Sequence, residues 1–292
     1  MIESRQIPVL AVDGGGTRCR VAIQREGEVI AVETGSANLS SDFDGTVAEI
    51  LGGLAALSSR ADMDMDDLVR LPAFVGLAGV TGPTIAERLR IKLPLTRLRI
   101  EDDRPAAVRG ALGARDGLIA HCGTGSFFAG QSGSKMVFSG GWGPVLGDEA
   151  SAQWVGRTAL MLTLEAADGR RACTGLAAAL LEHYDGPAGI VHFGGRARAP
   201  QFGAIAPMVT ERAAKGDDLA AHIMSLGAAE IVRSLSHLGW AAGRCICLTG
   251  GIGPQFEPYL PAAMQADVVL PKGEPLMGAL SLARALQKET RA

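Results

Sequence analysis

Three short glycine-rich segments are the residues of this sequence whose spacing indicates chemistry most directly. They are Asp13-Gly14-Gly15-Gly16-Thr17, Gly123-Thr124-Gly125-Ser126 and Thr249-Gly250-Gly251-Ile252-Gly253. Each follows a run of apolar residues typical of a strand. Glycine has no Cβ, so successive backbone amides in such a turn can approach an anion and bind phosphate. One turn of this kind can be an ordinary strand–turn junction, but three together predict a phosphate-binding protein.

Two common nucleotide-binding motifs are missing from the sequence. It contains no G-x-x-x-x-G-K-[ST] segment, and no G-x-G-x-x-G opens a helix after the first predicted strand. P-loop and dinucleotide-binding folds are therefore excluded, and the glycine turns must belong to another α/β architecture.

Carboxylates near predicted strand ends supply a second kind of chemistry. Glu101-Asp102-Asp103 closes a strand, and Gly147-Asp148-Glu149 follows Gly140-Gly141-Trp142-Gly143. Phosphorylating a hydroxyl needs a carboxylate that accepts its proton and directs its oxygen at the phosphorus. A tryptophan beside glycines can stack on a sugar, and a carboxylate can accept two hydroxyls. The alternative is that the acids at 102 and 103 only neutralise a helix N-terminus.

Taken in order, these segments resemble the N-acetylglucosamine kinase and BadF/BadG/BcrA/BcrD-type ATPase family, within the sugar kinase, Hsp70 and actin superfamily. The resemblance rests on DGGGT, Asn38 in GSANLS, GLAGV, the pair Asp102-Asp103, CGTGS, GGWGPVLGDE and TGGIG, and it runs from about Val9 to about Ala283. It implies a two-domain actin/hexokinase-like (ribonuclease H-like) fold, with duplicated βββαβαβα units and an interdomain cleft. It also implies an ATP-dependent kinase that phosphorylates N-acetylglucosamine or glucosamine.

The same resemblance implies roles for individual residues. Asp103 would be the catalytic base, and Asp13 would orient Mg²⁺, through water. ATP would be bound by Asp13, Gly15, Gly16, Thr17, Gly123, Thr124, Gly125, Gly250 and Gly251. The sugar would be bound by Asn38, Gly79, Asp103, Trp142 and Asp148. Taken alone, Asp13 could also cap a turn and Asn38 could also be a turn residue.

The loop after the acidic pair departs from the family pattern. Asp102 stands where family members more often carry asparagine, and Arg104 and Pro105 replace small residues. A proline is well tolerated in the first turn of a helix, where its missing N–H would have no partner within the helix. Whether Asp102 shares the role of Asp103 is left open by the sequence.

Residue periodicity predicts how these segments are positioned. The first half is predicted to form strands at Ile7–Asp13, Arg20–Gln24, Glu28–Glu33, Pro72–Leu77 and Leu98–Asp102, and helices at Asp44–Ser59, Pro83–Ile91 and Arg104–Leu112. The second half is predicted to form strands at Leu118–Cys122, Phe127–Gln131, Lys135–Ser139 and Arg244–Leu248, and helices at Asp148–Ala167, Gly175–Tyr184, Ala204–Lys215, Asp218–Leu238 and Leu276–Lys288. Each half thus opens with an antiparallel meander. We expect one domain at 1–114 together with a returning helix at 276–292, and another at 115–275.

Three polar residues of the second half carry separate expectations. Asp148 is predicted to cap the helix that follows it as well as to bind sugar. His121 lies in an apolar strand and is expected to be a core histidine whose polar atoms are satisfied. His192 is expected in a loop beside a helix, near Arg196 and Arg198.

Composition limits the class of protein. The chain has 292 residues, a hydrophobic content of 47% and a net charge of −3, which suit two buried cores and give no electrostatic attraction to nucleic acid. The first residues lack a secretory pattern and no apolar stretch is long enough to span a bilayer, so a cytoplasmic location is expected. The odd number of scattered cysteines, Cys19, Cys122, Cys173, Cys245 and Cys247, favours free thiols over disulfides or a metal site. By resemblance, the partners are a sugar, ATP and a second copy in a homodimer.

Two other functions are compatible with the same scaffold. One is an ATPase that activates a partner redox enzyme, of the acyl-CoA reductase or dehydratase activator type. Such activators share an iron–sulfur cluster across a dimer, and no cluster-type cysteine spacing occurs here. The other is a sugar-sensing protein on a kinase scaffold, for which no helix-turn-helix extension precedes Ile7.

Overall fold

The computed structural model describes residues 7–16 and 18–289. By internal contacts the chain divides into two compact units, Met1–Ala114 with Lys272–Ala292 (unit 1) and Arg115–Pro271 (unit 2). Each unit has its own sheet and its own buried core.

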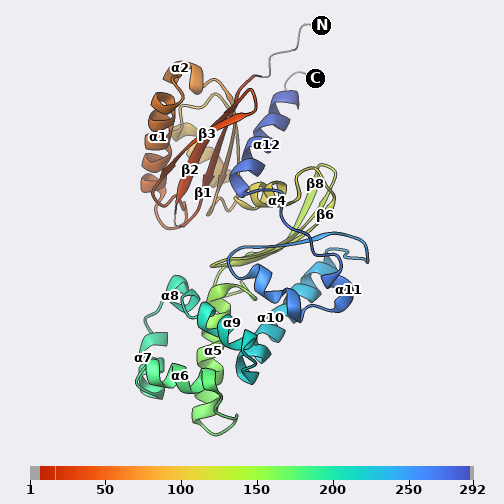
Figure 1. Cartoon of the computed structure of the whole chain (residues 1–292). Helices are drawn as coiled ribbons and strands as arrows, with labels where there is room; N and C mark the ends of the chain where they lie inside the picture. The colour runs from red at the N-terminus through yellow and green to blue at the C-terminus, as the bar shows by residue number, and fades with distance from the viewer. Residues whose placement is uncertain (1–6, 17, 290–292) are drawn as a thin grey trace. The chain divides into compact units, whose positions relative to one another are not determined.

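Unit 1 is built on a mixed sheet (Figure 1). Its strands are β1 (Val9–Gly14), β2 (Cys19–Arg25), β3 (Glu28–Thr34), β4 (Pro72–Leu77) and β5 (Arg97–Glu101), in the order β3-β2-β1-β4-β5. β1 and β2 pair antiparallel, as do β2 and β3, whereas β4 lies parallel to β1 and to β5. The meander is closed by Glu26 and Gly27, which both have positive φ, the geometry of a tight two-residue hairpin. The predicted antiparallel opening is therefore present.

Helices cover both faces of this sheet. They are α1 (Phe43–Arg60), α2 (Met65–Leu68), α3 (Pro83–Lys92), α4 (Arg104–Leu112) and α12 (Pro275–Glu289). Side chains alternate between the faces of a strand, so Leu10 and Val12 join the core under α1, while Val9 and Ala11 join the core under α12. Figure 1 shows α1 and α12 on opposite sides of the sheet. Asp13 continues the series of Val9 and Ala11, which places it on the α12 face.

Unit 2 opens in the same way but has a shorter sheet within the described residues. Its strands are β6 (Gly117–Cys122), β7 (Ser126–Ser132), β8 (Lys135–Gly140) and β9 (Ile246–Thr249), in the order β8-β7-β6-β9. The first pairs are antiparallel, and β9 lies parallel to β6. Beyond β9, pairing continues only as an isolated parallel bridge between Ile246 and Val268. The duplication is therefore one of topology, with the last strand of the second copy reduced to a bridge.

The helical part of unit 2 lies almost entirely between β8 and β9. It consists of α5 (Ala152–Ala167), α6 (Gly175–His183), α7 (Pro187–Gly194), α8 (Ala199–Gly203), α9 (Ala206–Ala214) and α10 (Asp218–His237), with η1 (Gly253–Tyr259) and α11 (Ala262–Gln265) after β9. The buried faces of α5 and α10 supply much of the core of the unit. The short elements α2, α7, α8, η1 and α11 were not predicted from the sequence. None of the described helices combines the length and the apolar composition needed to cross a membrane.

The helix predicted to start at Asp148 begins later, so this prediction was wrong. α5 starts at Ala152, and its cap is Ser151, whose hydroxyl accepts a hydrogen bond from the Trp154 amide at 3.3 Å. Asp148 and Ala150 have positive φ (59° and 63°), which is incompatible with a helix start. The loop prediction for His192 was also wrong, because that residue lies within α7.

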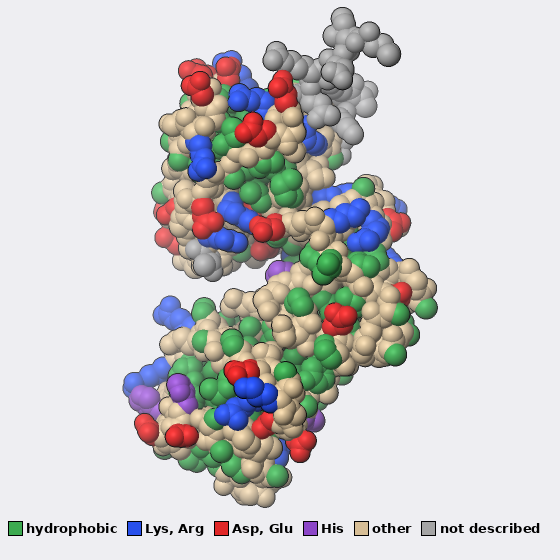
Figure 2. Space-filling view, viewed as in Figure 1, with side chains coloured by type: hydrophobic (Ala, Val, Ile, Leu, Met, Phe, Trp, Pro, Cys, Tyr) green, Lys and Arg blue, Asp and Glu red, His purple; other side chains and the backbone are tan. Residues whose placement is uncertain are grey.

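Charged side chains of both signs are interspersed over the face of each unit that Figure 2 shows. This mixture agrees with the small net charge of the sequence. Of the cysteines, Cys19, Cys122 and Cys247 are buried, Cys245 is half-buried and Cys173 is exposed, and all five are free thiols.

Candidate active site

A hollow in unit 1 brings together Asp103, the predicted catalytic base, and Asp13, the predicted magnesium-binding carboxylate. Its volume is about 180 Å³, and it is lined by Asp13, Gly14, Gly15, Gly16, Arg18 and Asp103. Asp13 lies at the carboxyl end of β1 and Asp103 follows β5. Because β1, β4 and β5 are parallel, their carboxyl ends meet at one edge of the sheet, where open α/β sheets bind ligands.

The glycine turn after β1 combines packing with an open surface. A Cβ at Gly14 would come within 2.9 Å of the Ala37 side chain, so this glycine is needed for close packing. Gly15 donates its amide to the Arg18 carbonyl at 3.0 Å, which closes the turn. A Cβ at Gly15 or Gly16 would meet no described atom within 4 Å, so the outer side of the turn is open to a ligand. Thr17, predicted to bind phosphate, lies outside the described residues.

The neighbouring carboxylates Asp102 and Asp103 have different partners. Asp102 forms a two-pronged ion pair with Arg104, with Oδ1 2.8 Å from Nε and Oδ2 2.9 Å from Nη2, and it also accepts the Arg104 amide. Asp103 is the N-cap residue of α4, but its side chain makes no capping hydrogen bond within the described residues. The helix start is therefore served by Asp102, and the Asp103 carboxylate is left for the hollow.

Burial changes the acidity of Asp103. Loss of water, together with the negative charges of Asp102 and Asp13, raises its pKa from 3.8 to about 6. A carboxyl with a pKa near 6 is ionised at neutral pH and is a stronger base than an ordinary aspartate. Its position and its acidity both suit a group that accepts a proton from a hydroxyl.

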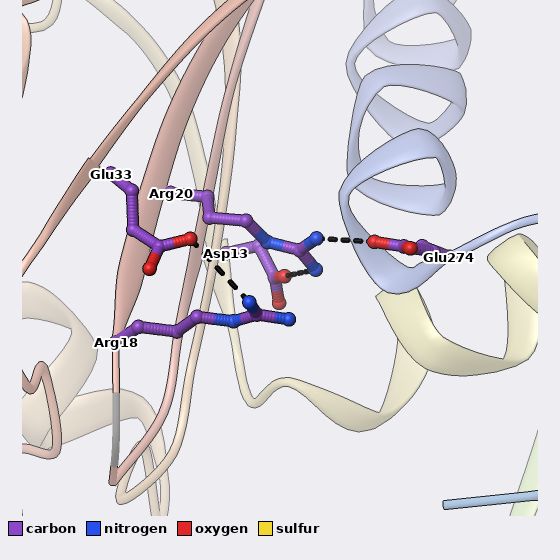
Figure 3. Close-up of polar contacts among 5 residues, drawn as sticks. All are labelled: Asp13, Arg18, Arg20, Glu33 and Glu274. Atoms are coloured by element: carbon purple, nitrogen blue, oxygen red, sulfur yellow. Dashed lines mark hydrogen bonds and ion pairs between the residues drawn. The ribbon is translucent and has the colours of Figure 1, made fainter.

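Asp13 is held by an arginine from the neighbouring strand (Figure 3). Arg20 Nη2 lies 2.6 Å from Asp13 Oδ2, and Arg20 Nη1 pairs with Glu274. Arg18, another residue of the hollow, pairs more loosely with Glu33 at 3.5 Å. The described residues contain no group of three or more side chains that could hold a metal by themselves. A single carboxylate beside an open turn suits Mg²⁺, which keeps several waters and binds through one or two carboxylates together with phosphate.

Asn38 and Gly79, both predicted to bind sugar, lie together in unit 1. Asn38 and Ala78 form an isolated bridge, and Asn38 Oδ1 accepts the Ser40 amide at 3.0 Å. Gly79 has a φ of 88°, and a Cβ there would come 2.9 Å from Asn38 Oδ1. Asn38 therefore stabilises the turn with its side-chain oxygen, Oδ1, and we expect its side-chain nitrogen, Nδ2, to face a ligand.

In unit 2 the two remaining glycine turns pack against each other. Gly250 has a φ of 80°, and a Cβ there would overlap the Cys122 carbonyl and come 2.7 Å from the Gly123 amide nitrogen. Gly123 donates its amide to the Gly125 carbonyl at 2.8 Å, which tightens the first of these turns around the exposed Thr124. A Cβ at Gly251 would meet no described atom within 4 Å. Gly250 thus fixes the turns together, and Gly251 presents open backbone.

Asp148 is buried against the first of these turns. A Cβ at Gly125 would come 2.8 Å from Asp148 Oδ2, and the carboxylate takes backbone hydrogen bonds from Ser126 and Gly143. Burial raises its pKa, and the two hydrogen bonds oppose that rise. The helix-cap prediction for Asp148 is replaced by this role within the loop, and its sugar-binding role stays a prediction.

Trp142 and Asp148 line one pocket of about 340 Å³ in unit 2. Trp142 is 76% exposed, so its indole is open to stack on a ligand. Ser126, Gly140 and Glu149, which belong to the motifs recognised in the sequence, also line it. The pocket is completed by residues that the sequence did not single out: Phe128, Ser139, Leu146, Glu230, Arg233, Ser234 and His237. Four of these come from α10, whose sequence shows only an amphipathic helix, so no local pattern could have identified them.

The two histidines singled out in the sequence lie in different environments. His121 Nδ1 is 3.0 Å from Thr249 Oγ1, and its ring stacks on Phe127 with centroids 5.0 Å apart. Burial lowers the pKa of His121 to about 4, so the ring is neutral at physiological pH. His192 is exposed on α7 and lies 2.9 Å from Arg196, away from the glycine turns in the sequence and in a separate pocket with Tyr184 and Phe193.

Comparison with known sequences identifies the family. The sequence model of the BadF/BadG/BcrA/BcrD ATPase family matches residues 10–283. The chain belongs to that family. The glucosamine kinase GspK of Vibrio cholerae serotype O1 is 26% identical over 278 residues, which cover 94% of this chain and 95% of the Vibrio protein.

Similarity to solved structures identifies the fold class of this BadF/BadG/BcrA/BcrD family member. A Chromobacterium violaceum protein assigned as an N-acetylglucosamine kinase superposes with a TM-score of 0.82 at 28% identity, over 95% of this chain and 99% of its own. A ROK-family glucokinase of Streptomyces griseus, solved with glucose and AMPPNP, superposes with a TM-score of 0.58 at 19% identity, over 95% and 99% of the two chains. The second similarity concerns the fold alone. Together they confirm the predicted actin/hexokinase-like class.

Proposed function

We propose that this chain is an ATP-dependent carbohydrate kinase that phosphorylates an amino sugar, N-acetylglucosamine or glucosamine. Two similar proteins carry the names glucosamine kinase and N-acetylglucosamine kinase. The observation that carries the proposal is that the neighbouring carboxylates of Asp102 and Asp103 have different surroundings. The Asp102 carboxylate is neutralised by Arg104, whereas the Asp103 carboxylate makes no capping bond within the described residues, lines the hollow and has a pKa raised to about 6.

Asp103 acts as the base in this proposal. It accepts the proton of the sugar hydroxyl as the oxygen attacks the terminal phosphorus of ATP, and it fixes the direction of that oxygen. Phosphoryl transfer depends on positioning and charge stabilisation more than on covalent catalysis, so no nucleophile is required. The neutral His121 takes no part in proton transfer.

The glycine turns bind the nucleotide in this proposal. Gly16 and the outer face of Gly15 in unit 1, and Thr124, Gly125 and Gly251 in unit 2, offer backbone to phosphate or ribose. Asp13 holds hydrated Mg²⁺ through Oδ1, since Oδ2 is engaged by Arg20. When bound, the metal supplies positive charge to the phosphate oxygens.

The sugar is bound by polar groups around an aromatic surface. Trp142 stacks on the apolar face of the ring, and the Asp148 carboxylate accepts its hydroxyls. In unit 1, Asn38 offers its side-chain amide to a sugar hydroxyl, and Gly79, where no side chain fits, offers backbone beside it.

A coupled ADP-release assay across hexoses, hexosamines and anhydro-sugars tests the proposal. We expect ATP turnover that depends on glucosamine or N-acetylglucosamine and exceeds the rate without sugar at least about 100-fold. The reason is that a sugar kinase must exclude water, which would otherwise attack ATP in place of the sugar hydroxyl. ATP turnover of the same rate with and without every sugar would instead indicate an ATPase of the activator type and would refute the kinase proposal.

A further inference from the structure

A chain of ion pairs links the glycine turn of unit 1 to the start of α12 (Figure 3). Arg20 on β2 donates from Nη2 to Asp13 Oδ2 at 2.6 Å and from Nη1 to Glu274. Asp13 and Arg20 stand directly opposite each other in the β1–β2 ladder, and Glu274 immediately precedes α12. One guanidinium thus bridges two carboxylates that are far apart in sequence, a task for which its planar fork of donors is suited.

Arg20 is held tightly in this place. Its side chain is only 14% exposed, and within the described residues its buried Nε has no hydrogen-bond partner. Burial alone would lower the pKa of Arg20, but the hydrogen bonds with Asp13 and Glu274 outweigh it and raise the pKa above its ordinary value. The two ion pairs therefore determine where the guanidinium lies, and it stays charged.

Glu274 is itself anchored through helix packing. A Cβ at Gly110 of α4 would overlap the Glu274 carbonyl, and a Cβ at Gly278 of α12 would overlap the Ala106 carbonyl of α4. These contacts show that the two helices pack closely, with no room for a side chain at either glycine. Since α4 begins directly after Asp103, the same packed pair of helices carries both Asp103 and the residue that holds Arg20.

We propose that Arg20 is a positioning residue for Asp13: it fixes Oδ2, so that Oδ1 is presented to the hydrated metal of bound nucleotide in one orientation, and Glu274 fixes Arg20 in turn. This inference rests on the proposed function, in which Asp13 serves the metal. Arg20 is not among the residues that line the hollow, so in this inference it acts through Asp13.

The substitution Arg20→Lys separates geometry from charge. Lysine keeps the positive charge, but a single ammonium cannot reproduce the two directed bonds to Asp13 and Glu274. Arg284→Lys is the matched control, because Arg284 also joins α12 to β2, with its Nε 2.8 Å from Gln24 Oε1, but does not touch Asp13. Glu274→Gln is a second variant that leaves the Asp13–Arg20 contact in place while weakening the anchor of Arg20.

The primary readout is the Mg²⁺ concentration that gives half-maximal binding of ADP, measured by isothermal titration calorimetry on the full chain. For Arg20→Lys we expect an increase of about threefold to tenfold, the range for a side chain released from one rotamer. We also expect a fall in kcat with the KM for sugar within about twofold of the wild type. Glu274→Gln should shift the Mg²⁺ requirement in the same direction by a smaller factor, and Arg284→Lys should leave it unchanged.

Three outcomes decide the matter. A wild-type Mg²⁺ requirement in a folded Arg20→Lys protein overturns the inference, as does an equal shift in Arg284→Lys, which would mean that only the docking of α12 matters. If Arg20→Lys does not fold, a wild-type requirement in Glu274→Gln overturns it. Asp13→Asn tests the proposed function separately from the role of Arg20. No effect of that change on the Mg²⁺ requirement would contradict the role of Asp13 in binding the metal.

Discussion

Replacing Asp103 by asparagine should make unit 1 more stable at neutral pH while removing the proposed base. The folded protein raises the pKa of Asp103 from 3.8 to about 6, mainly by burial. A folded-state pKa above the unfolded value means that the protonated form is favoured by folding, so stability falls as the pH rises from about 4 to about 6 and stays reduced above that. Asparagine cannot ionise and avoids this cost.

The size of the effect follows from the same values. At about 1.4 kcal/mol for each pKa unit, the full rise corresponds to about 3 kcal/mol as an upper limit. Asp103 is half-buried, and solvent screening reduces the expected gain to about 1–2 kcal/mol at pH 8. At pH 4 the wild-type carboxyl is mostly protonated in the folded state, so the two proteins should differ by only a few tenths of a kcal/mol.

Urea unfolding at pH 8 and pH 4, combined with hydrogen exchange of α4 amides to localise the change to unit 1, measures this gain. Asp102→Ala is the control, because it removes the ion pair with Arg104 and should cost about 1 kcal/mol at pH 8. If Asp103→Asn is less stable than the wild type by the same amount at both pH values, folding does not disfavour the ionised form of Asp103, and the reasoning fails.

Further predictions concern acidity, backbone and the sugar surface. The kcat/KM of the proposed reaction should fall about tenfold for each pH unit below about 6, as Asp103 becomes protonated, and this acidic limb should persist in His121→Gln because that histidine already titrates near 4. Gly250→Ala should destabilise unit 2 by more than about 2 kcal/mol in thermal unfolding, since its Cβ would overlap the Cys122 carbonyl at positive φ, whereas Gly251→Ala should change stability by less than about 0.5 kcal/mol and raise the KM for ATP. Trp142→Ala should leave stability within about 0.5 kcal/mol, since the side chain is 76% exposed, and raise the KM for sugar about tenfold in steady-state kinetics; an unchanged KM would remove Trp142 from the sugar site.

Local pattern was sufficient for the framework of the fold. The apolar runs that end at Asp13 and Cys122, each followed by glycines and two more short strands, predicted both meanders, and β4 and α4 have the predicted bounds. The sequence also predicted that Asp13 and Asp103 follow strands, and the parallel pairing of β1, β4 and β5 seen in the structure brings them to one sheet edge. These features depend on residue alternation and turn chemistry, which neighbouring residues determine.

What the sequence did not reveal depends on contacts between distant segments. Asp148 could not be recognised as a loop residue, because its conformation is held by backbone from Ser126 and Gly143. The pairing of Asp13 with Arg20 was accessible in principle, since a tight turn between two antiparallel strands places an acid opposite a base. The tie from Arg20 to Glu274 was not accessible, because it joins residues at opposite ends of the chain.

Phosphorus NMR of the reaction products tests the central claim most directly. With ATP and either glucosamine or N-acetylglucosamine, the wild-type protein should produce ADP and a hexosamine phosphate in equal amounts, and Asp103→Asn should slow this by about 100-fold or more. Inorganic phosphate in place of the sugar phosphate, or a rate for Asp103→Asn within about threefold of the wild type, would contradict the account.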